Sequence, residues 1–211
     1  MNPVRSLLLS ALFLLMLLAA YLWLLPQMPT VIPTHWNAQG QINGYMTPFK
    51  AVAAPMLVIA GLALLTILLP AISPRGYRIK PFASVFTIVM LAVQAFVLVT
   101  AFGVLLNGAG HPMHQPLVTT VGLGLLWMVM GNYMGKLRKN FFAGIRTPWT
   151  LANDEVWERT HRMAGWVFML AGLVTVIAAF AGAPLMVAIY VLVGAALIPA
   201  IYSYVIYQWL Q

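Results

Sequence analysis

Histidine and arginine side chains supply most of the chemistry that this sequence can offer. The 211 residues include four histidines and no cysteine, so thiolate ligands and thiol nucleophiles are absent. His111 and His114 are three residues apart. His35 lies in another polar loop, which we expect on the same side of a membrane as His111 and His114. Three histidines could bind zinc, but these loops contain no carboxylate, and Pro112 disfavours a helix there. We therefore predict no metal site and no cofactor.

A second group of reactive side chains lies between residues 131 and 165. This segment contains all three acidic residues of the chain and six of its eleven basic residues. Its cations could bind a phosphate, with His161 as acid and base and with Trp149 and Trp157 at the acyl boundary. The alternative is an amphipathic anchor that balances its own charges and is attracted to anionic lipid. The cations concerned are Lys139, Arg146, Arg159 and Arg162.

Two helix starts are predicted inside this segment. Thr147 followed by Pro148 is typical of a cap and a first helical residue. Asn153 is a second cap, and it precedes acidic residues that the helix dipole favours. The spacing i, i+4 then predicts two ion pairs, Glu155–Arg159 and Glu158–Arg162.

The elements that must position these residues are membrane helices. Hydrophobic residues make up 63% of the chain, charged residues make up only 7%, and the mean hydropathy is +0.93, which excludes an ordinary soluble domain. Six apolar stretches approach the ~20 residues that a spanning helix needs, so we predict an all-α polytopic membrane protein. The predicted spans are Ser6–Leu25, Val52–Ile72, Phe82–Leu105, Leu117–Met134, Ala164–Ala181 and Pro184–Tyr207.

The basic residues predict how these spans are oriented. Ten of the eleven fall on one side, and only Lys50 falls on the other. The positive-inside rule then places both termini in the cytoplasm of a multi-pass inner-membrane protein. The net charge of +8 is therefore a topological signal, and we predict no direct nucleic-acid partner. No charged residue lies in the middle of a span, which argues against a proton-driven transporter and against a carboxylate protease.

Small residues in the last two spans, among them Gly165 and Gly172, predict close helix packing in a hairpin that turns at residues 182–184. The first outer loop, residues 26–50, contains four prolines and two glycines, which argue against a long regular element. Within this loop, His35, Trp36 and Asn37 are suited to recognition. The alternative is that the loop only packs over the helix ends.

The cytoplasmic segment carries the run GNY-x-GK-x3-NFFAGIRTPWTL-x4-VW-x2-TH-x3-G. This run resembles the hallmark of the SdpI family of bacterial membrane proteins, which are named for immunity to the sporulation-delaying peptide toxin. The outer loop resembles a domain of unknown function that commonly precedes this segment. The family motif corresponds to Asn140, Gly144, Arg146, Thr147, Pro148, Trp149, Thr150, Trp157, Thr160 and His161. The outer-loop motif corresponds to Pro33, His35, Trp36, Asn37 and Gly40.

The resemblance implies a non-enzymatic immunity protein without catalytic residues. Its partners would be the lipid bilayer, a secreted peptide toxin outside and a transcriptional repressor inside. It also implies a first helical hairpin over residues 1–72 and a four-helix region over residues 73–211. Similar loops often carry acidic residues where this chain has Gln41 and Asn43, which argues against charge-based capture of a cationic ligand. The alternative function is an enzyme or carrier acting on a lipid headgroup at the cytoplasmic interface.

Overall fold

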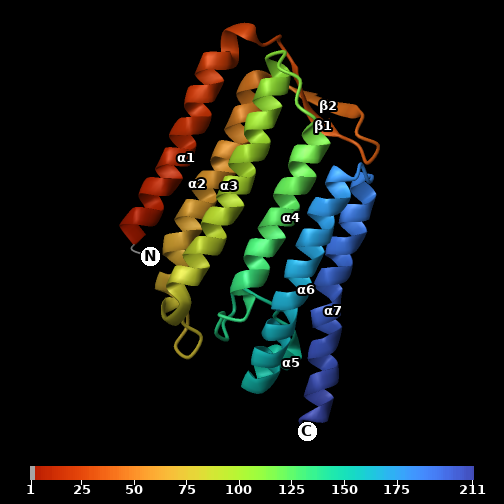
Figure 1. The fold of residues 1–211 in the computed structure, drawn as a ribbon. Helices are drawn as coiled ribbons and strands as arrows, with labels where there is room; N and C mark the ends of the chain where they lie inside the picture. Colours follow the sequence, from red (N-terminus) through yellow and green to blue (C-terminus); the bar gives the residue numbers. More distant parts are fainter. Residues whose placement is uncertain (1–2) are drawn as a thin grey trace.

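Six long helices dominate the computed structural model, which describes residues 3–211 (Figure 1). Within these residues, six helices are long and apolar enough to cross a membrane. The predicted all-α, multi-pass architecture is confirmed, whereas the cytoplasmic location of the termini stays a prediction. The long helices are α1 (Pro3–Leu24), α2 (Pro48–Ile72), α3 (Ala83–Gly108), α4 (Gln115–Met134), α6 (Asp154–Phe180) and α7 (Leu185–Trp209).

Helix α6 begins well before the apolar span that the sequence predicts there. The predicted span starts at Ala164, but the helix starts at Asp154. Asn153 caps it, because its Oδ1 accepts hydrogen bonds from the backbone N–H groups of Glu155 (2.8 Å) and Val156 (3.2 Å). The charged first turns of α6 are therefore continuous with its membrane span, and they carry the second half of the motif that we predict to be cytoplasmic.

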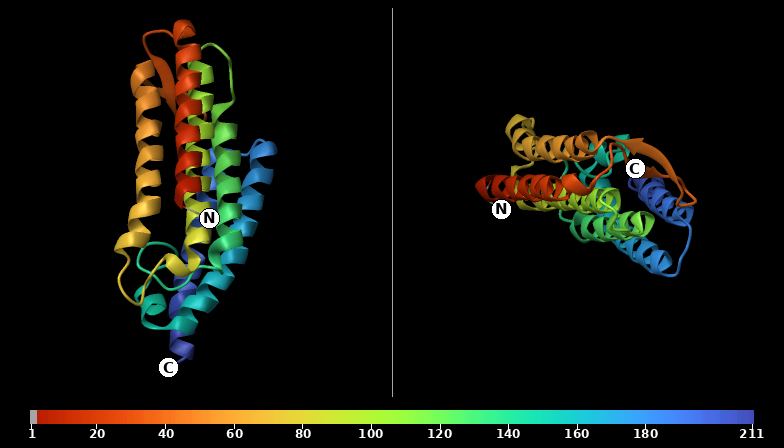
Figure 2. Two further views of the ribbon diagram at one scale, coloured as in Figure 1. Left: turned by 90° about the vertical axis from the view of Figure 1, so that its left-hand side faces the viewer. Right: turned by 90° about the horizontal axis from the view of Figure 1, so that it is seen from above.

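The helices form two packed groups that run side by side (Figures 1 and 2). Helices α1, α2 and α3 share one core, which includes Leu17, Ile59 and Leu105. The start of α3 joins α4, α6 and α7 in the second core, around Trp157 and Phe168. Helix α6 packs against both α4 and α7.

Glycines bring α4 and α6 into backbone contact. A Cβ added at Gly172 would lie 2.4 Å from the carbonyl oxygen of Gly124. One added at Gly131 would lie 2.8 Å from the carbonyl oxygen of Gly165. Close packing by small residues was predicted between α6 and α7, which are joined by a short turn. The glycines of α6, however, face α4 rather than α7.

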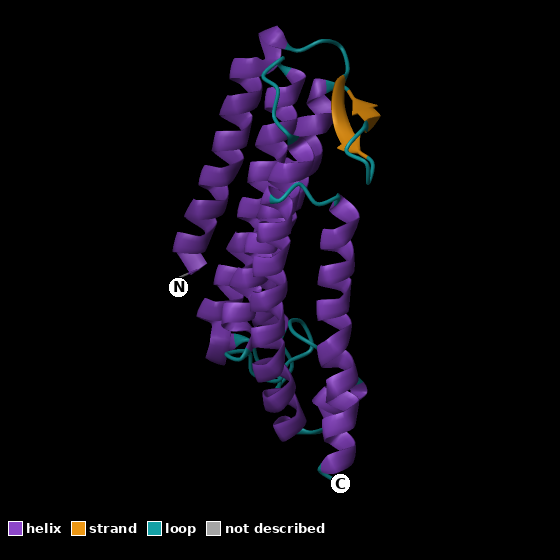
Figure 3. Cartoon of the chain, turned by 45° about the vertical axis from the view of Figure 1, so that its right-hand side comes forward, coloured by secondary structure: helices purple, strands orange, loops and turns teal. Residues whose placement is uncertain are grey.

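The loop between α1 and α2 contains a short antiparallel hairpin, shown in orange in Figure 3, that was not predicted. Its strands are β1 (Ile32–Trp36) and β2 (Ile42–Met46), and register shifts flank His35. Ile32 is fully buried and fits against Gly108, where an added Cβ would lie 2.8 Å from its side chain. The hairpin is thereby held on the end of α3.

Candidate functional site

The predicted cytoplasmic motif folds into one structured unit. It consists of residues 135–153, here called the α4–α6 loop, and the first turns of α6. The loop includes the short helix α5 (Pro148–Ala152), which packs on α6 and α7. Three motif residues, Asn140, Thr150 and Thr160, are completely buried. The Thr160 hydroxyl has no hydrogen-bond partner within residues 3–211.

Asn140 organises the first half of the α4–α6 loop. Its Nδ2 donates to the carbonyl oxygens of Arg138 (2.8 Å) and Ala143 (3.0 Å). Its Oδ1 accepts from the backbone N–H groups of Phe142 and Ala143, both at 2.7 Å. One buried side chain thus satisfies four backbone groups that would otherwise lack partners in this irregular segment.

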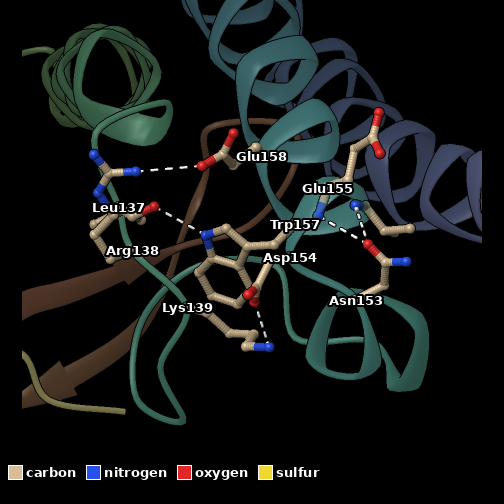
Figure 4. Close-up of polar contacts among 9 residues, drawn as sticks. Leu137, Arg138, Lys139, Asn153, Asp154, Glu155, Trp157 and Glu158 are labelled. Carbon is tan, nitrogen blue, oxygen red and sulfur yellow. Dashed lines mark hydrogen bonds and ion pairs between the residues drawn. The ribbon is translucent and has the colours of Figure 1, made fainter. Parts of the chain in front are cut away.

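Trp157 and His161 connect the loop to α6. Their rings stack with centroids 4.0 Å apart, and Trp157 Nε1 donates to the carbonyl oxygen of Leu137 at 2.9 Å (Figure 4). His161 Nε2 lies 3.0 Å from the backbone N–H of Ile145, and its Nδ1 lies 2.8 Å from the carbonyl oxygen of Trp157. A backbone N–H can only donate and a carbonyl can only accept, so the imidazole is neutral with its proton on Nδ1. Both ring nitrogens are therefore occupied.

Gly144 allows the loop to pass over this imidazole. Its φ of +102° lies in the region that favours glycine, and an added Cβ would lie 2.4 Å from His161 Nε2. The glycine of the motif is therefore required by backbone conformation and by the closeness of the histidine ring.

Thr147 and Pro148 begin α5 as predicted. Thr147 caps the helix, and its backbone N–H donates to Thr150 Oγ1 at 3.0 Å. The Thr147 hydroxyl also lies 2.9 Å from the hydroxyl of Ser203 in α7. Trp149 packs on Tyr204, with ring centroids 5.0 Å apart. The loop is therefore tied to α7 as well as to α6.

The charged side chains of this unit mostly neutralise one another (Figure 4). The predicted Glu155–Arg159 pair is present, and Lys139 pairs with Asp154. The predicted Glu158–Arg162 pair is wrong: Glu158 instead contacts Arg138 at 3.3 Å, because the α4–α6 loop brings this arginine beside α6. The guanidinium of Arg146 donates to the carbonyl oxygen of Phe141. The predicted phosphate grip is thus not assembled in this conformation.

Replacing Asn140 by alanine should destabilise the α4–α6 loop. Two partly buried N–H groups and two carbonyl groups would lose their partner, and each lost hydrogen bond costs about 0.5–1.5 kcal/mol net. We expect faster proteolysis of residues 136–147 and a lower melting temperature of the purified protein in detergent. Asn132→Ala is the matched control, because Asn132 is exposed at the end of α4. Equal proteolysis of the two variants would contradict this role for Asn140.

The outer-loop motif residues stabilise the hairpin. Asn37 Oδ1 accepts from the backbone N–H groups of Gln39 (3.0 Å) and Gln41 (2.9 Å), and Gly40 has a φ of +77°. His35 Nδ1 lies 2.5 Å from Asn43 Oδ1. Asn43, which replaces an expected acid, thus takes part in a hydrogen bond across the hairpin.

The other two outer histidines have separate local partners. His111 Nε2 lies 3.2 Å from Gln27 Oε1, and His114 Nδ1 accepts from the backbone N–H of Leu117 as a cap of α4. In residues 3–211, no three His, Asp or Glu side chains are grouped as metal ligands.

Comparison with known proteins agrees with this geometry. Residues 136–205 match the SdpI/YfhL protein family, and this range contains the α4–α6 loop from Lys136 onward and the first turns of α6. All ten residues of the predicted motif lie inside this match. Residues 11–59 match a domain of unknown function that includes the hairpin, so both resemblances inferred from the sequence are confirmed. The division at residues 72 and 73 stays a prediction.

One curated relative supports the same assignment. Immunity protein SdpI of Bacillus subtilis (strain 168) is 33% identical over 95 residues, which cover 44% of this chain. The match spans 46% of that protein, about half of its length. No solved structure matches the chain.

Sequence reasoning named several residues that the structure brings together in this unit, but not all of their partners. Ser203 was missed, although a serine in a mostly apolar span was an available signal. The carbonyl groups of Leu137 and Phe141 carry no sequence signal, because every residue has one.

Proposed function

We propose that this protein is a non-enzymatic membrane immunity protein that protects its producer against a secreted, membrane-active peptide. The observation that carries the proposal is the SdpI-family match over residues 136–205, together with similarity to an immunity protein of Bacillus subtilis. The six membrane-spanning helices place the chain in the compartment where such a peptide acts.

The outer hairpin is the surface that we propose meets the peptide. Large apolar side chains are exposed on this hairpin and at the start of α2, and Phe49 is 67% exposed. An exposed apolar patch of this kind is typical of contact with lipid or with an apolar partner. The patch consists of Val31, Ile42, Tyr45, Met46 and Phe49.

On the opposite face, we propose that the α4–α6 loop contacts a cytoplasmic repressor. The loop is well suited to a fixed docking surface because its buried polar groups bind one another and leave Phe141 and Arg146 exposed. An enzyme or carrier for lipid headgroups receives less support. In that alternative His161 would transfer protons, yet both of its ring nitrogens are occupied.

Expression in a toxin-sensitive host tests the immunity function. We expect the chain to raise survival of a Bacillus subtilis strain without its own SdpI when that strain is challenged with the sporulation-delaying peptide. A strain carrying an unrelated six-span protein at equal membrane abundance is the control. Equal killing of the two strains would contradict the proposed function for this toxin class.

A further inference from the structure

Three cations near the end of α4 have no carboxylate partner within residues 3–211. Each of the three acidic residues of the chain is already paired, with Arg138, Lys139 or Arg159. The cations of this region that remain without a carboxylate are Lys80 just before α3, Lys136 just after α4, and Arg162 on α6. Lys136 lies over the ring of Tyr133, which leaves its positive charge uncompensated. The charge of all three side chains is therefore available to an anion.

These three cations line one cavity of about 570 Å³. The cavity lies between the start of α3, the end of α4 and the first turns of α6, and its volume falls within the ~300–1,000 Å³ typical of small-ligand sites. Arg138 and Glu158 also line it, but they pair with each other at 3.3 Å. His161 lines it as a neutral ring whose two nitrogens are both occupied. The lining therefore carries a net charge of +3, which favours an anion.

A second cavity, of about 260 Å³, shares Gly135, Lys136 and Arg162 with the first. A Cβ added at Gly135 would lie 3.8 Å from the Cα of Arg162, so the end of α4 lies directly against α6 here. The rest of the lining belongs to the apolar spans of these two helices and consists of Gly131, Asn132, Gly165, Trp166 and Met169. Because α4 ends at this face and α6 begins there, these residues lie deeper in the membrane than the three shared ones.

The two cavities together select a ligand that carries a phosphate next to a hydrocarbon chain. Lys and Arg bind phosphate oxygens through charge-assisted hydrogen bonds. A free phosphate would leave the second cavity unfilled, and a lipid without net charge would leave the cations uncompensated. Lys136 and Arg162 lie just beyond the predicted spans that end at Met134 and begin at Ala164, which is the level of the lipid headgroups. Trp166, which is 71% exposed, is typical of this interfacial level.

We propose that these two cavities bind one anionic phospholipid of the surrounding bilayer, with its phosphate at Lys136 and Arg162 and part of one acyl chain between α4 and α6. Basic pockets between transmembrane helices bind anionic headgroups in this way. Of the cations that the sequence suggests for a phosphate, only Arg162 takes part. The site contains no residue of the outer hairpin, so it does not depend on the proposed immunity function. A bound lipid would bridge α4 and α6 directly beside the α4–α6 loop.

Lipid titration of the delipidated full chain in detergent, followed by native mass spectrometry, tests the site. We expect the chain to retain one phosphatidylglycerol at about 10-fold lower lipid concentration than one phosphatidylcholine with the same acyl chains. Lys136→Gln/Arg162→Gln should bind phosphatidylglycerol at least about 10-fold more weakly and lose this preference, because both phosphate-binding cations are gone.

The matched control is Arg75→Gln/Arg78→Gln, which removes the same charge from the segment between α2 and α3. Both arginines are exposed, and neither lines the two cavities. This variant should keep the preference for phosphatidylglycerol. An equal loss in the two double variants, or no preference in the unaltered chain, would overturn the proposal.

A further variant tests the acyl chain. Gly135→Leu places a side chain where the two cavities meet and leaves the charge unchanged, and the φ of −68° at Gly135 accepts a side chain. It should weaken phosphatidylglycerol binding at least about 10-fold by occupying the space. Gly61→Leu is its control, because no atom lies within 4 Å of a Cβ added at Gly61 on α2.

Competition with inorganic phosphate distinguishes a lipid from a free anion. Phosphate at the same concentration as phosphatidylglycerol should not displace the lipid, since it lacks the chain that fills the second cavity. Displacement by phosphate, or unchanged lipid binding in folded Gly135→Leu, would overturn the phospholipid as the occupant. If Gly135→Leu does not fold, the comparison of the two double variants decides.

Discussion

Replacing Gly172 by leucine should separate α4 from α6 and destabilise the whole bundle. A Cβ at this position would lie 2.4 Å from the carbonyl oxygen of Gly124 and 2.9 Å from the backbone nitrogen of Met128. Backbone atoms cannot rotate away as a flexible side chain can, so the helices must move apart. Overpacking commonly costs about 1–3 kcal/mol, and we expect the upper end or more. In a chain of this size, 3 kcal/mol corresponds to a fall in Tm of about 6–12 °C.

The control for this prediction is Gly61→Leu in α2. No atom lies within 4 Å of a Cβ added at Gly61, and the residue is exposed. Its Tm in the same detergent should stay close to that of the unaltered protein, since leucine is also the better helix former. Similar Tm values for Gly172→Leu and Gly61→Leu would show that the contact between α4 and α6 does not determine stability.

Replacing Gly144 by alanine should disrupt the α4–α6 loop with less effect on the transmembrane bundle. The positive φ costs about 1–3 kcal/mol for a residue with a side chain. The added Cβ also collides with His161 Nε2, so the bond from the Ile145 N–H must break at a further cost of about 1–3 kcal/mol. We expect rapid proteolysis of the α4–α6 loop and reduced function in the toxin challenge.

Gly76→Ala separates the two causes. Gly76 also has a positive φ, +88°, but no atom lies within 4 Å of an added Cβ. It should show backbone strain alone and leave the α4–α6 loop resistant to protease. If Gly144→Ala behaves like Gly76→Ala, the contact with His161 does not stabilise the motif.

The membrane spans were predictable because each is a long apolar run, and such runs have few alternatives in lipid. The start of α6 was predictable from the cap at Asn153, whereas hydropathy alone places the apolar span only from Ala164 onward. The hairpin was not predicted because Pro33 lies inside β1 and the register is irregular around His35. Its position depends on Ile32 meeting Gly108, a contact between residues far apart in sequence.

The residues of the candidate site could be predicted from the sequence, but the partners of their side chains could not. The sequence indicated that His161 and the cations belong together, and a phosphate site was one of the alternative interpretations of that pattern. The structure instead uses His161 and Asn140 to satisfy backbone groups of the loop. Lys139 and Arg159 form ion pairs with acidic residues and are therefore not free to bind a phosphate. Polar residues that stabilise an irregular backbone and polar residues that bind a ligand have similar compositions, and only their partners distinguish them.

The hydrogen bond between Thr147 and Ser203 links the α4–α6 loop to α7, and α7 is long enough to cross the membrane. The helix has 25 residues and is therefore about 37 Å long, with Leu185 as its first residue and Ser203 near the opposite end. If Leu185 moved, α7 would tilt, and the other end of α7 is hydrogen-bonded to the α4–α6 loop through Ser203. Pro199 lies four residues before Ser203, and a helix bends most readily at a proline. Movement at the start of α7 would therefore reach the α4–α6 loop as a change in the bend of α7 at Pro199.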